Sequence, residues 1–431
     1  MPARLDSRSA DFTGRFNAFL AMKREVSADI ESATRAIVDD VAARGDAALI
    51  EATRRFDRLE LDAAGLRIKP AEIDAAVKAC DAKTLEALTF ARDRIEIFHR
   101  RQLPKDERFT DALGVELGWR WSAIEAVGLY VPGGTAAYPS SVLMNAVPAK
   151  VAGVARVAMV VPSPDGKLNP LVLAAAHLGG VSEIYRVGGA QAVAALAYGT
   201  ATIAPVAKIV GPGNAYVAAA KRLVFGKVGI DMIAGPSEVL VIADRTGNAD
   251  WIAADLLAQA EHDANAQSIL ITDSAALADD VARAVETQLT TLPRAEIARA
   301  SWQDFGAIIL VKSLDDAVTL ANSIAAEHLE IMTADPESLS AQIRNAGAIF
   351  LGAHTPEAIG DYVGGSNHVL PTARSARFSS GLGVLEFMKR TSILKCGPDQ
   401  LRLLGPAAMT LGKAEGLDAH ARSVALRLNL P

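Results

Sequence analysis

Three pairs of side chains have the types and the spacing of metal ligands. Gln259 and His262 are three residues apart within a helix predicted over 251–263, and residues at that spacing share one helix face. Glycines let the loop from Asp361 to His368 turn tightly, and the third pair consists of Glu415 and His420. A carboxylate, an amide and neutral imidazoles suit a borderline divalent ion such as zinc. Because the spacing alone also fits polar residues with no common centre, a shared metal site is a hypothesis at this point.

The adjacent residues Glu327 and His328 form a candidate acid–base pair. They follow a helical stretch predicted over 314–326 and precede a strand predicted over 329–332. Neighbours on a strand point to opposite faces, so only a turn before the strand lets both side chains face one cavity. In that case the pair supplies a carboxylate and a base that titrates near neutral pH. The alternative is a histidine at a helix C-terminus, where the helix dipole favours its positive charge.

Glycine-rich turns follow three of the predicted strands, at 132–134, 188–191 and 211–214. Ligands of open α/β sheets bind outside the carboxyl ends of the strands, where backbone N–H groups can meet phosphate oxygens. However, no GxGxxG motif stands between a strand and a helix, so the usual dinucleotide fingerprint is absent. Plain tight turns explain these glycines equally well.

The remaining histidines and the two cysteines give no site. We expect His99, His177 and His354 to be surface residues or hydrogen-bonded core residues. Cys80 and Cys396 lie outside every motif described here and do not form a CxxC pair. A thiolate nucleophile of the kind used by many aldehyde oxidisers is therefore not favoured.

The composition is that of an ordinary globular protein with small-molecule partners. The net charge of −6 argues against a nucleic-acid partner, and two cysteines are too few for a secreted disulfide scaffold. The N-terminus lacks the apolar core of a signal peptide, and Lys150 and Arg156 interrupt the most apolar stretch, 142–161. We therefore expect a cytoplasmic protein with no membrane span.

The order of the predicted elements indicates an α/β protein with two parallel sheets. Residues 1–110 look helical, and strands then alternate with alanine-rich helices from residue 123 onward. The predicted strands form two series, 124–131, 157–161, 184–187 and 208–210, then 239–243, 268–272, 307–311, 329–332 and 348–351. We predict an N-terminal helical segment (1–25), a first α/β domain (26–129 and 237–384), a second α/β domain (130–236) and a C-terminal helical arm (385–431).

Taken together, these segments resemble the histidinol dehydrogenase family. The matching segments occur in the family's order and span residues 128–420, most of the chain. They are Gly128–Gly134, Val187–Ala192, Ile209–Asn214, Ile230–Glu238, Asp255–Asp263, Glu327–Glu330, Gly360–Asp361, Asn367–Thr372 and Glu415–His420.

The resemblance implies a set of functional residues and a subunit arrangement. It implies Zn²⁺ ligands (Gln259, His262, Asp361 and His420), substrate contacts (Ser237, His368 and Glu415, with the zinc ligands and His328), NAD contacts (Tyr130, Gln191 and Asn214) and an acid–base pair (Glu327 and His328). It also implies a homodimer of two incomplete Rossmann-like domains, in which the C-terminal arm completes the partner's site. One departure is Ala326, where the family usually has a proline that would stiffen the turn.

The reaction implied by the resemblance is the four-electron oxidation of L-histidinol to L-histidine through the aldehyde, with two molecules of NAD. In it, His328 would accept the alcohol proton and Glu327 would activate the water that adds to the aldehyde. Two alternatives remain, an enzyme of the same fold acting on another small amino alcohol and an inactive binding protein that keeps the fold. The presence of Glu415, His420, His368 and Ser237 favours histidinol, and an intact Glu327–His328 pair argues against an inactive protein.

Overall fold

The computed structural model describes residues 2–22, 28–133 and 138–430, which form two compact units. The larger unit contains Met1–Gln102 and Glu125–Phe387, and the smaller unit contains Leu103–Ile124 and Met388–Pro431. Gly134, the last residue of the first family segment, lies outside the described residues. No helix within these ranges is both long and apolar enough to cross a membrane.

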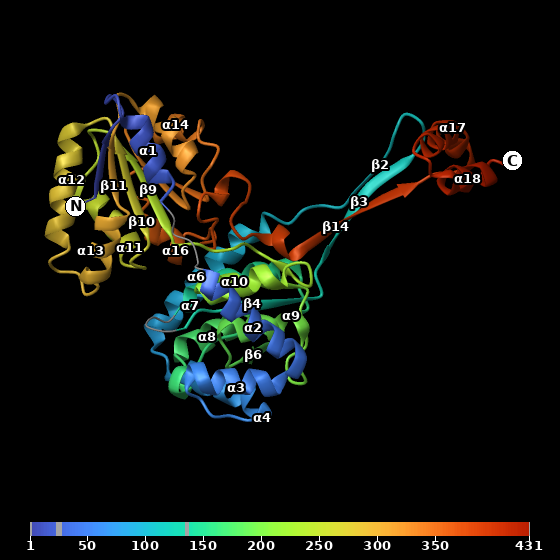
Figure 1. The fold of residues 1–431 in the computed structure, drawn as a ribbon, viewed down its shortest axis with the longest axis horizontal. Helices are drawn as coiled ribbons and strands as arrows, with labels where there is room; N and C mark the ends of the chain where they lie inside the picture. Colours follow the sequence, from blue (N-terminus) through green and yellow to red (C-terminus); the bar gives the residue numbers. More distant parts are fainter. Residues whose placement is uncertain (1, 23–27, 134–137, 431) are drawn as a thin grey trace. The chain divides into compact units, whose positions relative to one another are not determined.

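A six-stranded, all-parallel sheet with the order β1-β11-β10-β9-β12-β13 forms one half of the larger unit (Figure 1). Its strands are β1 (Ala3–Asp6), β9 (Glu238–Ala243), β10 (Gln267–Thr272), β11 (Ala307–Leu310), β12 (His328–Met332) and β13 (Ala348–Leu351). One face packs on α1 (Phe12–Leu20), α14 (Leu314–Ile324) and α15 (Pro336–Ser340), and the other on α11 (Ala249–Ala260), α12 (Ala275–Gln288) and α13 (Ala295–Asp304). The short helix α16 (Glu357–Tyr362) contacts α11.

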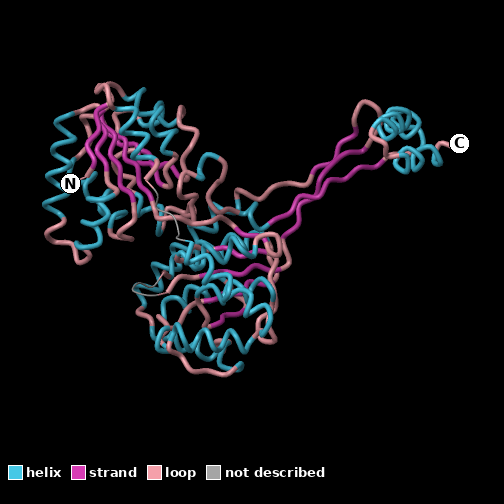
Figure 2. Tube along the Cα trace, viewed as in Figure 1, coloured by secondary structure: helices cyan, strands magenta, loops and turns pink. Residues whose placement is uncertain are grey.

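A five-stranded, all-parallel sheet with the order β6-β5-β4-β7-β8 forms the other half of this unit (Figure 2). Its strands are β4 (Ala126–Tyr130), β5 (Arg156–Val160), β6 (Glu183–Tyr185), β7 (Lys208–Val210) and β8 (Gly229–Ile230). The surrounding helices are α2 (Ala28–Arg44), α3 (Asp46–Asp57), α4 (Ala63–Leu66), α5 (Pro70–Ala79), α6 (Ala82–Arg100), α7 (Pro139–Ala152), α8 (Pro170–Gly179), α9 (Gly189–Tyr198) and α10 (Ala215–Val224). Three single turns of 3₁₀ helix lie at Pro164–Gly166, Ser375–Arg377 and Val384–Phe387.

The two sheets confirm the predicted α/β class. Strands covered by helices on both faces read as continuous apolar runs rather than as alternating patterns. Every residue of β9 and of β10 is buried, which matches this rule.

The N-terminal part of the chain differs from the prediction in two ways. The segment 1–25, predicted as helical, begins with strand β1, which pairs in parallel with β11 at the edge of the six-stranded sheet. The helices between residues 28 and 66 were grouped with the sheet of 237–384, yet Val38 and Leu49 share a core with Tyr130 and Ile209 of the five-stranded sheet. An apolar stripe on a helix shows which face is buried but not against which sheet, so the sequence did not carry this information.

The smaller unit combines a three-stranded antiparallel sheet with two helices. Its strands are β2 (Glu107–Thr110), β3 (Glu116–Ala123) and β14 (Met388–Lys395), in the order β14-β3-β2, and its helices are α17 (Pro398–Ala414) and α18 (Asp418–Arg427). The C-terminal arm, predicted as helical from residue 385, therefore begins with a strand after the turn that ends at Phe387. Most residues of β14 are exposed, so the strand lacks the buried alternation that would have revealed it.

Candidate active site

One cavity of about 1900 Å³ collects most of the residues singled out in the sequence. The segments after β4 and β7 line it at the carboxyl ends of the five-stranded sheet, where open α/β sheets bind ligands, whereas the segments before β9, β10 and β12 line it at the amino ends of the six-stranded sheet. The singled-out residues that line it are Asn214, Ser237, His262, Glu327, His328, Asp361 and His368. The cavity is therefore the candidate site.

A left-handed turn brings Glu327 and His328 to this cavity together. Helix α14 ends at Ile324, and the φ of 50° at the next residue, Ala325, redirects the chain before β12 begins at His328. Glu327 Oε2 accepts the backbone N–H of Glu238 at 3.0 Å, and His328 Nδ1 lies 3.1 Å from the backbone carbonyl oxygen of Glu238. A carbonyl can only accept, so Nδ1 carries the proton and Nε2 faces Asp361. The turn required by the sequence argument is present, and both side chains line one cavity.

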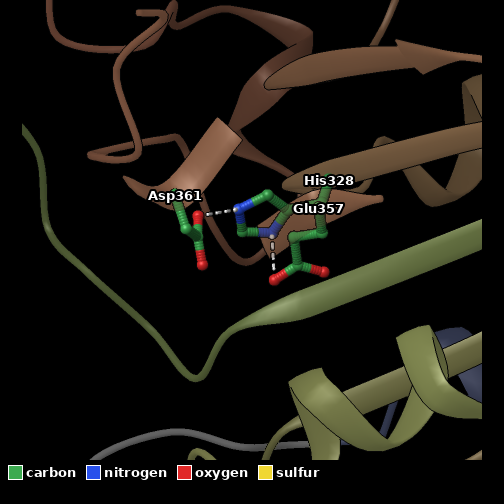
Figure 3. A group of neighbouring side chains, drawn as sticks. All are labelled: His328, Glu357 and Asp361. Carbon is green, nitrogen blue, oxygen red and sulfur yellow. Dashed lines mark ion pairs between the residues drawn. The ribbon is translucent and has the colours of Figure 1, made fainter. Parts of the chain in front are cut away.

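Two carboxylates on helix α16 flank the imidazole of His328 (Figure 3). Glu357 Oε1 lies 3.7 Å from Nδ1, and Asp361 Oδ1 lies 3.6 Å from Nε2. Glu357 and Asp361 are four residues apart, so they share one face of the helix. The ring is thus held between two carboxylates, and Glu327 Oε2 lies 3.8 Å from Nδ1.

The electrostatics of this group give the two adjacent residues different protonation behaviour. Burial alone would lower the pKa of His328, but Glu357, Glu327 and Asp361 together raise it well above its usual value of 6.5. Burial raises the pKa of Glu327 to about 7, although His328 and the N–H of Glu238 oppose the shift. A carboxylate with a pKa near 7 can accept a proton at neutral pH, which is what a general base needs.

The C-terminal end of α11 supplies the next candidate ligands. The helix ends at Ala260, earlier than predicted, and the N–H of His262 donates to the carbonyl of Gln259 at 3.2 Å in the turn that follows. Gln259 is fully buried, and neither its side-chain oxygen nor its nitrogen has a hydrogen-bond partner among the described residues. Leaving a buried amide without a hydrogen bond typically lowers the free energy of unfolding by about 1–3 kcal/mol. A bound ligand that contacts this side chain would remove that cost. An amide, an imidazole and a carboxylate are donor types that suit zinc, and of Gln259, His262 and Asp361 the last two line the cavity while Gln259 is buried behind its surface.

The glycine turn after β7 also lines the cavity. Gly211 has a φ of 104°, and a side chain there would collide with the carbonyl of Tyr130. Asn214 Oδ1 caps helix α10 by accepting the N–H groups of Tyr216 and Val217. The turn at 211–214 thus brings backbone N–H groups and a helix N-terminus to the cavity.

The other two residues expected to contact NAD lie beside this turn and do not line the cavity. The Tyr130 hydroxyl accepts the N–H of Gly189 at 2.9 Å, at the first residue of α9. Gln191 is buried in the same helix. Tyr130 therefore holds the N-terminus of α9, and Gln191 lies inside that helix.

Residues 20–428 match the profile of the histidinol dehydrogenase family. The histidinol dehydrogenases of Nitrobacter winogradskyi and Bradyrhizobium diazoefficiens are 87% identical over 429 residues and 84% identical over 430 residues, and both alignments cover 100% of each chain. The chain belongs to the histidinol dehydrogenase family. The crystal structure of histidinol dehydrogenase from Elizabethkingia anophelis agrees, with a TM-score of 0.95 at 35% identity, covering 99% of this chain and 98% of that one.

Membership of the histidinol dehydrogenase family confirms the resemblance found in the sequence and makes the protein an oxidoreductase. Two of the residues that the resemblance implies, Glu415 and His420, lie in the smaller unit, where both are exposed. Their expected part in the site therefore stays a prediction.

Sequence reasoning missed one member of the cluster, Glu357. The residue is buried and sits four positions before Asp361, so a helix would place both on one face. That spacing was the available signal, but a six-residue helix is too short to show a periodic apolar pattern, so none was predicted between the strand over 348–351 and the loop after Asp361.

The loop that carries His368 packs on helices α6 and α7. His368 Nδ1 lies 3.1 Å from the carbonyl of Asp361, and Nε2 lies 3.2 Å from Ser141 Oγ. The preceding residue, Asn367, donates its amide to the carbonyl of Met144 and lies 3.4 Å from Nε2 of His99. His99 is a hydrogen-bonded core histidine, one of the two alternatives expected for it.

We predict that His99 makes the protein sensitive to acid. Burial lowers the pKa of His99 below 6.5, so its contribution to stability is present above pH 6.5 and is lost as the pH falls through the folded-state pKa. In His99→Gln, the fall in unfolding free energy below pH 6.5 should be less steep than in the wild type. Denaturant titrations at several pH values measure this slope. The exposed His177 provides the control, since His177→Gln should keep the wild-type slope; equal slopes in all three proteins would contradict the prediction.

Proposed function

We propose that this protein oxidises L-histidinol to L-histidine through the aldehyde, with two molecules of NAD and one zinc ion per subunit. The observation that supports the proposal most strongly is the group of Glu327, His328 and Asp361 in one cavity that is also lined by the glycine turn after β7. The names of the similar proteins support the choice of histidinol as the substrate.

Gln259, His262, Asp361 and His420 would hold the zinc. When bound, zinc orients the imidazole and amine nitrogens of the substrate, as a template rather than as a source of hydroxide. The unpaired amide of Gln259 supports this assignment, whereas the part of His420 rests on the family resemblance. Ser237, His368 and Glu415 would contact the substrate.

Two residues would divide the proton transfers between the two oxidations. In the first oxidation, His328 takes the proton of the substrate hydroxyl as hydride leaves the same carbon. His328 can do so only when Nε2 is free of a proton. Asp361 is one of the groups that raise the pKa of His328, so engaging Asp361 as a ligand would remove part of that upward shift. In the second oxidation, Glu327 takes a proton from the water that adds to the aldehyde carbon.

The NAD side of the proposal involves Tyr130, Gln191 and Asn214. When bound, NAD accepts one hydride in each of the two oxidations. The turn after β7 lines the cavity with a helix N-terminus that suits the phosphates of NAD, and Asn214 caps that helix. Tyr130 holds the start of α9 in place through the N–H of Gly189.

We predict two NADH per histidinol and loss of activity with a chelator. The stoichiometry follows from removing two hydrides from one carbon, and the metal dependence follows from the buried Gln259 amide and the Asp361 carboxylate. Measuring NADH by absorbance and histidine by chromatography, before and after chelation and with zinc added back, tests both points. One NADH per substrate would contradict the four-electron reaction. Full activity in metal-free protein would contradict the role of zinc.

The proposed homodimer allows a complementation test. If the C-terminal arm of one subunit completes the site of the other, a mixed dimer of His262→Ala and His420→Ala subunits contains one intact site in two. We therefore expect mixed dimers to regain about half of the activity per dimer, whereas each variant alone is inactive. Separation of tagged mixed dimers followed by the NADH assay measures this, and no regained activity would argue against shared sites.

A further inference from the structure

Three elements that carry proposed functional residues meet at one buried carboxyl group. Glu330 lies on β12, two residues after His328, and its side chain is buried. Glu330 Oε1 accepts the backbone N–H of Glu357 at 2.7 Å, at the first residue of α16. Asp255, on helix α11, hydrogen-bonds the Glu330 carboxyl with its own. One side chain therefore links β12, α16 and α11.

The contact between these two carboxyl groups requires a shared proton. Glu330 Oε2 is buried, and no described donor reaches it. Two ionised carboxylates only accept hydrogen bonds, so a bond between them exists only when one carries a proton. Burial raises the pKa of Asp255 to about 6, and burial and the Asp255 carboxylate raise the pKa of Glu330 well above its usual value, which agrees with a proton kept in the pair at neutral pH.

We propose that Asp255 and Glu330 are positioning residues that hold the metal-binding residues of α11 and α16 in place beside His328. Asp255 lies one helical turn before Gln259, and Glu357, whose N–H is held by Glu330, lies one turn before Asp361. Fixing these two turns fixes the distance between the amide and the carboxylate that would share the ion. This inference deepens the proposed function and rests on its zinc site.

The experiment compares variants that keep the hydrogen bond with variants that remove it. Asp255→Asn and Glu330→Gln replace the shared proton by an amide N–H of similar shape, and Glu330→Gln keeps the oxygen that accepts the N–H of Glu357. Asp255→Ala and Glu330→Ala remove the contact. Zinc affinity is measured on metal-free protein by competition with a chromophoric chelator, and kcat and KM for histidinol are measured on the zinc-loaded enzyme.

We expect the alanine variants to bind zinc about 10–100-fold more weakly, the range typical of residues that orient metal ligands. The amide variants should stay within about threefold of the wild type, because their hydrogen bond is retained. KM for histidinol should rise in the alanine variants, since the substrate is oriented by the ion, while KM for NAD should not change. Zinc affinity that is retained in the amide variants and lost in the alanine variants would show that the hydrogen bond positions the zinc ligands.

Glu183 provides a matched control. It is a largely buried carboxylate of the five-stranded sheet, ion-paired with Arg156, so Glu183→Ala should lower stability without changing zinc affinity. Wild-type zinc affinity in folded alanine variants would overturn the inference, and so would amide variants as weak as the alanine variants. If the alanine variants do not fold, the zinc affinity of the amide variants tests the inference alone, and an affinity more than about threefold below that of the wild type would overturn it. Failure of the wild type to bind zinc or to oxidise histidinol would instead overturn the proposed function.

Discussion

Replacing Glu327 by glutamine should slow the oxidation of the aldehyde by about 10²–10⁴-fold, the usual contribution of a general base. Glutamine is nearly isosteric, and its side-chain oxygen can still accept the N–H of Glu238, so the turn before β12 should remain intact. The amide cannot take a proton from water. Alcohol oxidation needs no added water and should be slowed much less.

The converse variant, His328→Asn, should slow alcohol oxidation by a similar factor, because the amide of asparagine cannot accept the hydroxyl proton as the imidazole does. Rapid-mixing experiments that follow NADH, started with either histidinol or histidinaldehyde, separate the two oxidations. If both variants were equally defective in both oxidations, the division of roles between Glu327 and His328 would be wrong.

All strands of the two parallel sheets except β1 and β8 could be predicted from the sequence, because most of them are runs of buried apolar residues. β7 was predicted with its observed bounds, 208–210, and β12 and β13 to within one residue, because each is a short apolar run between turn residues. β1 was missed because Arg4 and Asp6 interrupt its apolar residues. It is an edge strand next to β11, and only Leu5 of its four residues is buried.

The candidate site could be predicted where residues are close in sequence or carry a family motif. Glu327 and His328 share a cavity because of one residue with positive φ, Ala325, which nothing in its type reveals. The pairing of Asp255 with Glu330 joins positions 75 residues apart, and acidic residues in apolar segments are the only local sign of it. Such contacts depend on how α11 packs on β12, which sequence spacing does not specify.

A second large effect is expected at Lys221, which lies behind the glycine turn of the cavity. Lys221 Nζ pairs with Asp231 and donates to the carbonyl of Gly211 at 3.0 Å, and the side chains of Lys221 and Asp231 are 3% and 1% exposed. Asp231 in turn accepts the N–H of Gly211 at 2.7 Å. Both partners thus hold the turn that precedes Asn214.

Lys221→Met should destabilise the protein by about 3–5 kcal/mol, because it leaves the buried Asp231 carboxylate without its cation. The double variant Lys221→Met/Asp231→Asn should recover part of this loss, since it removes the unpaired charge and keeps an oxygen for the N–H of Gly211. Denaturant unfolding measures the loss, with the exposed Lys227→Met as a control that should stay within about 0.5 kcal/mol of the wild type. Because Gly211 is held on both its N–H and its carbonyl, KM for NAD should rise in Lys221→Met even well below the unfolding midpoint. A variant as stable as the wild type would show that Asp231 is satisfied by backbone N–H groups alone, and the turn would then not depend on the ion pair.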